Sequence, residues 1–119
     1  MVISLFVVVA VWRPVDSVEY ARQIRAQVDM AAIRTQLDSY RKLNGFYPTT
    51  EQGLDALVTR AESSPIPARW MQHFKEVPRD AWQHPYVYRY PSSKAPSTFD
   101  IFCLGPDGVE SSDDIYPAP

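Results

Sequence analysis

Residues 16–44 read DSVEYARQIRAQVDMAAIRTQLDSYRKLN, a stretch without proline or glycine that decides the fold. Asp16 or Ser17 can cap the start of a helix, and Glu19 places a negative charge in its first turn, where the helix dipole favours one. Asn44 and the following Gly45 both tolerate the left-handed backbone with which helices commonly end. The sequence therefore predicts one long helix over residues 16–44.

The apolar residues of this helix form two stripes. The main stripe follows steps of four and three, which keep its members on one face, and it consists of Ala26, Met30, Ile33, Leu37 and Tyr40. We expect it to pack on the chain's own globular part. A shorter stripe lies nearly opposite, since each residue turns a helix by about 100°, and it consists of Ile24, Val28 and Ala31. We expect this second stripe to be exposed in a monomer and covered by another subunit.

The composition is typical of one globular domain with nearly balanced charge. The chain has 119 residues, 45% of them hydrophobic, and its 12 basic and 14 acidic side chains give a formal charge of −2. This balance argues against a nucleic-acid-binding protein, which usually needs a basic face. One cysteine cannot form an internal disulfide or a Cys-rich zinc site, and two histidines leave little material for a His-based metal centre. Ten of the eleven prolines lie from Pro48 onward, which excludes a long helix from the second half.

The N-terminal run MVISLFVVVAVW, residues 1–12, is apolar apart from Ser4. As a helix it would span about 18 Å at roughly 1.5 Å per residue, whereas a bilayer core is about 30 Å thick. No Lys or Arg precedes the run and no A-x-A site follows it, as both would in a signal peptide. A buried strand is the alternative, but the position of the run favours membrane insertion or a trimmed membrane helix. We treat residues 1–15 as an apolar N-terminal segment and residues 16–119 as one domain.

The second half predicts short elements joined by turns. Thr49 or Thr50 can cap a helix that runs to about Arg60, and residues 70–74 can form a helical turn. The stretches YVYRY (86–90) and FDIFCL (99–104) alternate as strands do, and an antiparallel hairpin is the economical way to pair them. The many aromatic residues of this half are interpreted as core.

Catalytic candidates are few. Cys103 lies in an apolar strand, where a free cysteine usually behaves as a small buried hydrophobe. His73 and His84 are interpreted as structural or solvated, and the sequence holds no G-x-S-x-G, P-loop, Rossmann or H-E-x-x-H motif. No nucleophile and base can be paired, so we predict that the protein is not an enzyme.

The stretch LGPDGVESSDDI, residues 104–115, is the part of the sequence that indicates a candidate binding site. Asp107, Glu110, Asp113 and Asp114 crowd into eight residues, interleaved with turn-forming glycine and serine. Ca²⁺ selects such oxygen ligands from carboxylates and backbone carbonyls, although the spacing is not that of an EF-hand. The residues alone leave two interpretations open, a calcium loop or a solvated acidic turn.

Three segments carry a resemblance to a known family. They are YRKLNGFYPTTEQGLDALV (40–58), RWMQHFKEVPRDAWQHPYVYRY (69–90) and FDIFCLGPDGVESSDDI (99–115). In this order they resemble the segments that follow the long helix in the major pseudopilins of type II secretion, the G-type subunits, including the motif D-P-W-G-N-P-Y and a final strand ending in L-G-A-D-G. The resemblance covers roughly residues 20–115.

The sequence departs from the family pattern in several places. Ala81 and Gln83 stand where the family motif has proline and glycine, so we expect an altered turn. The acidic loop is shorter than in the family, and Ser112 replaces the first Asp of a D-A-D sequence. Family precursors begin with a basic leader, a peptidase-site glycine and F-T-L-x-E. This chain shows none of these, so we expect a truncated start or a divergent member that prepilin peptidase does not process.

The resemblance implies an α+β pilin fold, with a long N-terminal helix packed on a small antiparallel sheet and a C-terminal loop. It implies a structural subunit that self-assembles into a helical periplasmic fibre with other pseudopilins. The fibre would stand on an inner-membrane platform and help to export proteins, with residues 1–15 as the membrane segment and 16–119 as the periplasmic domain. A minor type IV pilin in adhesion or DNA uptake and, less well supported, a small secreted hydrolase are the alternatives. Such minor pilins normally carry a C-terminal disulfide, for which this chain lacks the cysteines.

The resemblance also favours the calcium interpretation of the acidic loop. It points to Asp107, Asp114 and the Leu104 carbonyl as leading ligands of a structural Ca²⁺. Asp113 would make up for Ser112, and other carbonyls of residues 109–112 and water would complete six to eight oxygens.

Overall fold

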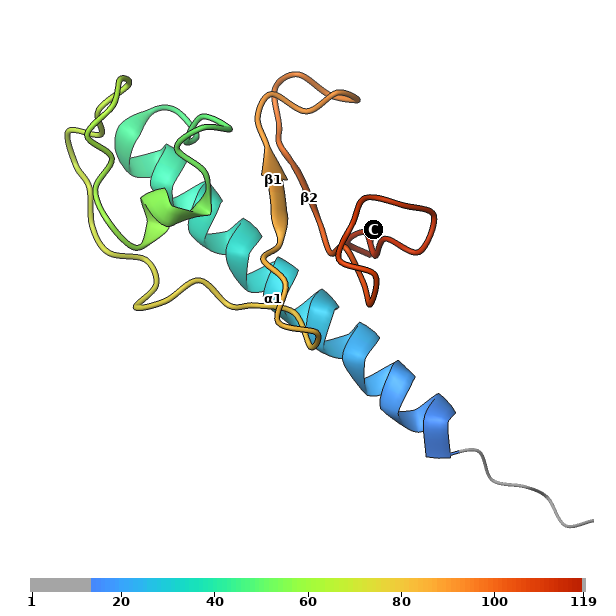
Figure 1. The fold of residues 1–119 in the computed structure, drawn as a ribbon. Coiled ribbons are helices and arrows are strands. Elements are labelled where there is room, and N and C mark those ends of the chain that lie inside the picture. The colour runs from blue at the N-terminus through green and yellow to red at the C-terminus, as the bar shows by residue number, and fades with distance from the viewer. Residues whose placement is uncertain (1–13, 119) are drawn as a thin grey trace, which may run out of the picture.

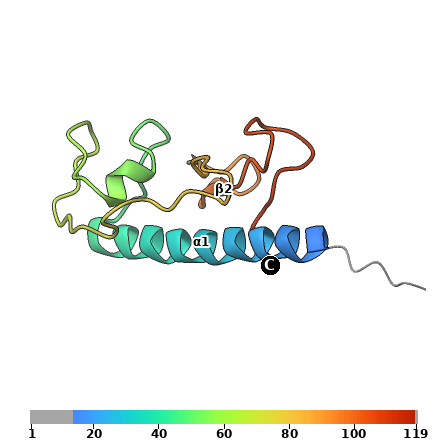
Figure 2. The same cartoon turned by 60° about the horizontal axis from the view of Figure 1, so that its bottom comes forward.

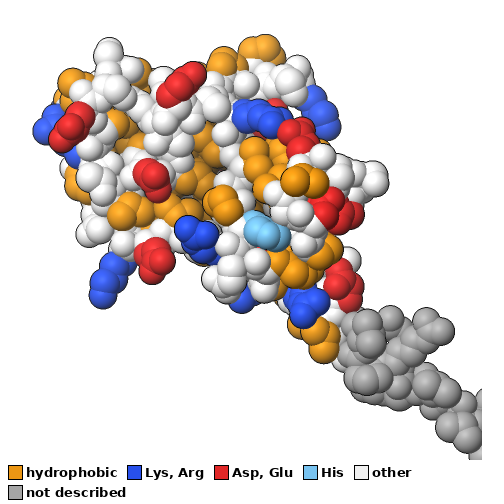
Figure 3. Space-filling view, viewed as in Figure 1, with side chains coloured by type: hydrophobic (Ala, Val, Ile, Leu, Met, Phe, Trp, Pro, Cys, Tyr) orange, Lys and Arg blue, Asp and Glu red, His pale blue; other side chains and the backbone are white. Residues whose placement is uncertain are grey.

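The computed structural model describes residues 14–118, with side chains from Ser17 onward, and consists of a long helix with the rest of the chain on one side of it (Figures 1 and 2). The elements are helix α1 (Pro14–Asn44), a 3-10 helix η1 (Leu54–Leu57) and strands β1 (Val87–Arg89) and β2 (Asp100–Phe102). The first turns of α1 project beyond the remainder of the domain (Figure 1), and acidic and basic side chains are interspersed over the face of the domain that Figure 3 shows. The expected membrane segment, residues 1–12, lies outside the described residues. Within the described part, no helix has both the length and the apolar character of a membrane span.

The main stripe of α1 forms the floor of the hydrophobic core, as predicted. Met30, Ile33, Leu37 and Tyr40 are 0% exposed and Ala26 is 1% exposed. They pack in one cluster with residues from every later element, namely Tyr47, Leu54, Ala56, Leu57, Tyr86, Tyr88, Ile101 and Cys103. The predicted aromatic core is confirmed at Tyr40, Tyr47, Tyr86 and Tyr88. Three other aromatic residues of the prediction are only partly buried against it, namely Tyr90, Trp70 and Trp82.

The second stripe of α1 faces solvent in the monomer. Ile24 is 45% exposed and Val28 is 62% exposed, and Ala31 is exposed as well. The exposure predicted for the monomer is confirmed. Most of the described chain lies on the opposite side of the helix (Figure 2), and the tail residues Pro117 and Ala118 border the exposed stripe.

The predicted hairpin is present, although its strands are short. β1 and β2 pair antiparallel, with Tyr88 opposite Ile101 at the centre. Tyr88 points into the core, where its hydroxyl donates to the Pro48 carbonyl at 2.7 Å. After β2, the backbone of Cys103 exchanges two 2.8 Å hydrogen bonds with Ile115, so the C-terminal segment returns beside the strand.

The predicted helix from Thr49 to Arg60 is wrong except for η1. The capping contacts do form, because the Gln52 amide donates to Thr49 Oγ1 at 3.1 Å and the Thr49 amide donates to Gln52 Oε1 at 3.0 Å. They close only one turn, because Gly53 has φ +64° and ends the right-handed backbone. The Gln52 side chain instead donates to the Ser63 and Pro65 carbonyls, which ties down the following loop.

The helical turn predicted at residues 70–74 is also absent. The amides of His73 and Phe74 both donate to the Leu57 carbonyl, at 2.9 and 3.1 Å, and the Trp70 indole donates to the Ala56 carbonyl at 2.8 Å. This segment therefore satisfies its donors on η1 instead of within a helix of its own.

The turn of residues 80–84 closes despite its departures from the family motif. Asp80 is fully buried, and its Oδ1 accepts hydrogen bonds from the amides of Trp82 and His84 at 2.9 and 2.8 Å. Gln83 adopts φ +67°, the left-handed conformation that the family glycine reaches without steric cost. The turn therefore keeps its closed shape, and the expected alteration is limited to the strain of a side-chain-bearing residue at position 83.

We predict opposite outcomes for truncation on the two faces of α1. Leu37→Ala removes a fully buried side chain from the floor of the core and should cost about 2–5 kcal/mol. Val28→Ala removes an exposed one and should change the stability by about 0.5 kcal/mol or less. Denaturant unfolding of the two variants measures both, and equal losses would contradict this division of the helix.

We also predict that glycine suits the turn at position 83 better than a branched residue does. Gln83→Gly relieves a left-handed backbone that costs a side-chain-bearing residue about 1–2 kcal/mol, and this gain exceeds or offsets the extra freedom of glycine in the unfolded chain. Gln83→Val should lower the stability by about 1 kcal/mol or more, since β-branched residues avoid this region. Thermal unfolding compares the variants, and a stability order of Val above Gly would refute the argument.

Candidate metal centre

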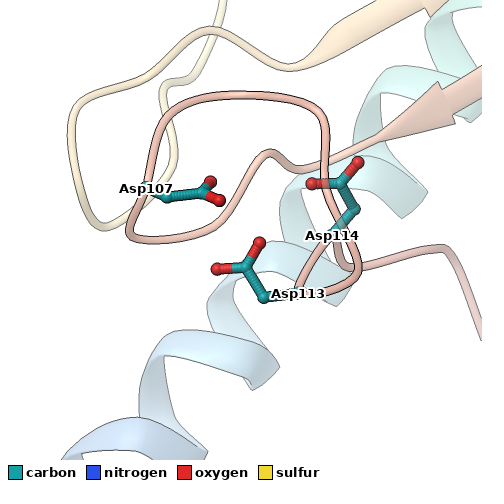
Figure 4. A group of neighbouring side chains, drawn as sticks. All are labelled: Asp107, Asp113 and Asp114. Atoms are coloured by element: carbon teal, nitrogen blue, oxygen red, sulfur yellow. The ribbon is translucent and has the colours of Figure 1, made fainter.

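The acidic segment forms a closed loop at the end of β2. The paired Cys103 and Ile115 form its base, and the loop doubles back on itself between them. Figure 4 shows that Asp107 comes from one limb and that Asp113 and Asp114 come from the returning limb. One carboxylate oxygen from each of the three lies within 4.8 Å of the others. The structure therefore brings together three of the predicted ligands.

The hydrogen bonds of the loop leave this group of carboxylates incompletely satisfied. The Ser111 hydroxyl lies 2.6 Å from Asp107 Oδ2 and also contacts Asp113 Oδ1, but it carries only one hydrogen to donate. Asp114 Oδ1 accepts from the Ser111 amide at 3.2 Å, while its Oδ2 is buried and has no partner among the described residues. A buried carboxylate oxygen without a donor is costly unless a cation satisfies it.

Asp107 is adapted to the charged form. Hydrogen bonds from the Ser111 hydroxyl and then from the Val109 amide hold the pKa of its carboxyl below the usual value. The carboxylate therefore remains ionised well below neutral pH, which is the state that a metal ligand requires.

The donor set fits Ca²⁺. All three converging side chains offer oxygen, and Ca²⁺ takes six to eight oxygen ligands in flexible geometry from carboxylates, carbonyls and water. Of the other predicted residues, Leu104 is half-buried where the chain leaves β2, and Ser112 is exposed in the returning part of the loop. Ser111 bridges the carboxylates of Asp107 and Asp113, a role that the sequence pattern did not indicate.

Two further residues contact the loop from outside. His84 Nδ1 lies 3.0 Å from the Gly105 carbonyl, and Arg89 forms a two-point ion pair with Glu110. Both contacts join residues 21 positions apart, so no local sequence pattern could have indicated them.

Cys103 and His73 lie in buried or partly buried surroundings. Cys103 is buried, and burial, followed by the neighbouring Asp80 carboxylate, raises the pKa of its thiol to about 12. The thiolate form needed for nucleophilic attack is therefore negligible at neutral pH. His73 binds Gln36 Oε1 through Nδ1 at 2.9 Å, and burial lowers its pKa. Both residues are structural, as the sequence predicted.

Comparison with known proteins identifies the family. Residues 13–116 match the model of the family described as "Type II secretion system (T2SS), protein G". The chain belongs to this family. It is 40% identical over 98 residues to the type II secretion system core protein G of Pseudomonas aeruginosa, covering 81% of this chain and 68% of the relative. The corresponding Vibrio cholerae protein is 40% identical over 97 residues, covering 80% of this chain and 64% of the relative. The chain thus spans about two thirds of the length of these curated relatives.

A solved structure supports the same assignment. The major pseudopilin of enterohaemorrhagic Escherichia coli superposes with a TM-score of 0.78 at 36% identity, covering 86% of this chain and 90% of that one. The protein G fold is therefore the one predicted, an α+β pilin-like fold with a long helix on a small antiparallel sheet. This protein is a pseudopilin, a structural subunit of type II secretion.

Proposed function

We propose that this pseudopilin assembles with copies of itself and with other pseudopilins into a helical periplasmic fibre that helps to drive protein export. The observation that carries the proposal is an exposed apolar patch on the N-terminal half of α1, with Arg34 at its border. Ile24, Val28 and Ala31 lie on it, and Ala21, Ala32 and Thr35 are exposed close to them. A helix that is exposed on one side normally carries charged residues there, so an apolar exposed face points to a protein partner.

The C-terminal tail extends this face. Gln27 Nε2 donates to the Tyr116 carbonyl at 2.8 Å, and the Ala118 amide donates to Gln27 Oε1 at 2.7 Å. These bonds hold the tail against the helix beside a shallow groove of about 360 Å³, whose walls include Ile24, Val28 and Pro117. A second copy of the chain is the partner that the family supplies, because the subunits of a fibre meet through surfaces that recur on every copy.

We place the globular domain in the periplasm and the apolar residues 1–12 in the inner membrane, where the secretion platform resides. The first turns of α1 project beyond the domain and follow this apolar run in the chain. The projection supports an arrangement in which the domain stands away from the membrane surface on its own helix.

The acidic loop is proposed to hold a structural Ca²⁺. Asp107, Asp113 and Asp114 would supply the charged ligands, and the Leu104 carbonyl, with Ser112 or its neighbours, would supply further oxygens. The convergence of three carboxylates and the unpartnered oxygen of Asp114 support this assignment. The ion would offset the carboxylate repulsion and fix the C-terminal loop to β2; its role is structural.

We predict that a charge on the exposed face of α1 prevents assembly without unfolding the monomer. Ile24→Glu or Val28→Glu would bury a carboxylate in the interface, which is costly without a partner. Electron microscopy of cells that express the variant with its secretion apparatus should show fibres lost, while circular dichroism of the isolated domain stays unchanged. Ile66→Glu is the matched control, because Ile66 is equally exposed but lies far along the chain in the loop after η1. Normal fibres from both α1 variants would contradict the proposed interface.

We predict that Ca²⁺ raises the melting temperature. With a dissociation constant on the order of 10⁻⁴–10⁻³ M, as in extracellular modules, an excess of about 10 mM Ca²⁺ adds roughly 1–3 kcal/mol. This corresponds to a shift of several degrees relative to chelator in a scanning calorimeter. Asp107→Ala should abolish the shift, whereas Glu62→Gln, at an exposed carboxylate in another loop, should retain it. Identical melting of the unaltered protein in Ca²⁺ and in chelator would show that the loop is a solvated acidic turn.

A further inference from the structure

Glu110 is the one carboxylate of the acidic loop that turns away from the converging group. Its Oε1 and Oε2 accept hydrogen bonds from the two terminal nitrogens of Arg89 at 3.2 and 2.7 Å. Two parallel bonds fix the relative orientation of the two groups, unlike a single-point surface ion pair. Each partner favours the charged form of the other, so the pKa of Glu110 is lowered and that of Arg89 is raised.

Arg89 is itself held in place by the hairpin. It ends β1, and its guanidinium lies 5.4 Å from the centre of the Phe102 ring across the sheet. Phe102 is buried and stacks on Tyr116 at 5.3 Å, beyond the far end of the loop. The ion pair therefore connects the middle of the loop to a strand and to a ring stack that already brackets the loop.

His84 makes a second connection near the start of the loop. The Gly105 carbonyl can only accept, so its 3.0 Å contact with Nδ1 is a hydrogen bond when Nδ1 carries the hydrogen. Gly108 packs against the same imidazole so closely that a Cβ there would lie 2.8 Å from Nε2. His84 is fixed in turn by the Asp80 turn, whose carboxylate accepts from its amide at 2.8 Å.

Neither connection uses Asp107, Asp113 or Asp114. We propose that Arg89, through Glu110, is a positioning residue that holds the acidic loop in its cation-ready shape before any ion binds. This rests on the proposed calcium site and adds a role for two residues outside the ligand set. The His84 contact supports the loop nearer its start, at Gly105 and Gly108. A loop ordered in advance gives up less conformational entropy on binding, so the affinity for the ion is higher.

Substitution of Arg89 and of Glu110 distinguishes a positioning role from a purely electrostatic effect on Ca²⁺ binding. Arg89→Met removes a positive charge near the site, and by Coulomb attraction alone it would strengthen Ca²⁺ binding. Glu110→Gln removes a negative charge and by the same argument would weaken it. If positioning dominates, both variants bind Ca²⁺ more weakly, by about threefold or more, and the double variant is no weaker than the weaker single one. Lys75→Met is the control for loss of a positive charge, since Lys75 is exposed in another part of the chain and forms no ion pair within the described residues.

The experiment has two readouts on the folded domain. Calorimetric titration with CaCl₂ gives the affinities, and hydrogen exchange of the amides of residues 107–112 in chelator reports loop order without metal. We expect faster exchange of these amides in Arg89→Met and Glu110→Gln than in the parent protein and in Lys75→Met. Stronger binding in Arg89→Met, or unchanged exchange in both variants, would overturn the proposal. If the parent protein binds no Ca²⁺, the calcium site fails, while exchange in chelator still decides whether the ion pair orders the loop.

Discussion

The burial of one face of α1 is the constraint on which the rest of the structure depends. Strands of three residues and a single turn of 3-10 helix cannot form a stable unit alone, because they bury too little apolar surface. The stripe from Ala26 to Tyr40 supplies a rigid apolar floor, and each later segment packs on it. Tyrosine hydroxyls then add specific ties, such as the 2.7 Å bond from Tyr86 to Asp29 on the helix. The helix therefore acts as the scaffold of an otherwise irregular domain.

The same dependence explains how the C-terminal loop is placed. The chain returns beside β2 at Ile115, stacks Tyr116 on Phe102 and then meets Gln27 on α1. The acidic loop is thus enclosed between segments that are anchored on both sides. Its ends are ordered by backbone pairing, which leaves the three converging carboxylates as the part of the loop that an ion can stabilise. The tail beyond it lies along the edge of the exposed face of α1, so the proposed metal site and the proposed assembly surface are neighbours through a short run of chain.

The two faces of α1 differ in what they contribute to the monomer. The face that builds the core must be apolar for the monomer to fold, and the opposite face gains nothing for the monomer from Ile24 and Val28. Their exposure is what supports the proposed contact with a second copy of the chain. The buried thiol of Cys103 contacts the Asp80 carboxylate, and the partly buried His73 contacts Gln36 on α1, so both take part in packing and hydrogen bonding.

The sequence alone determined the long helix, its two faces, the hairpin and the residues of the acidic cluster, because periodicity and turn composition are local properties. The predicted start of the helix, with Asp16 or Ser17 as its cap, is wrong because α1 begins at Pro14, and proline is well suited to the first turn of a helix. The family resemblance of three ordered motifs determined the pilin-like fold. Local patterns failed after Thr49, where capping residues were present but Gly53 took a left-handed backbone and the segment of residues 70–74 bonded to η1 instead of to itself. They also gave no sign of the Arg89–Glu110 pair, of the His84 contact or of the bridging position of Ser111. The Arg89–Glu110 and His84–Gly105 contacts join residues 21 positions apart, which the tertiary packing brings together and no local segment selects. Ser111 bridges two carboxylates of its own loop, and this becomes visible only when the loop is closed.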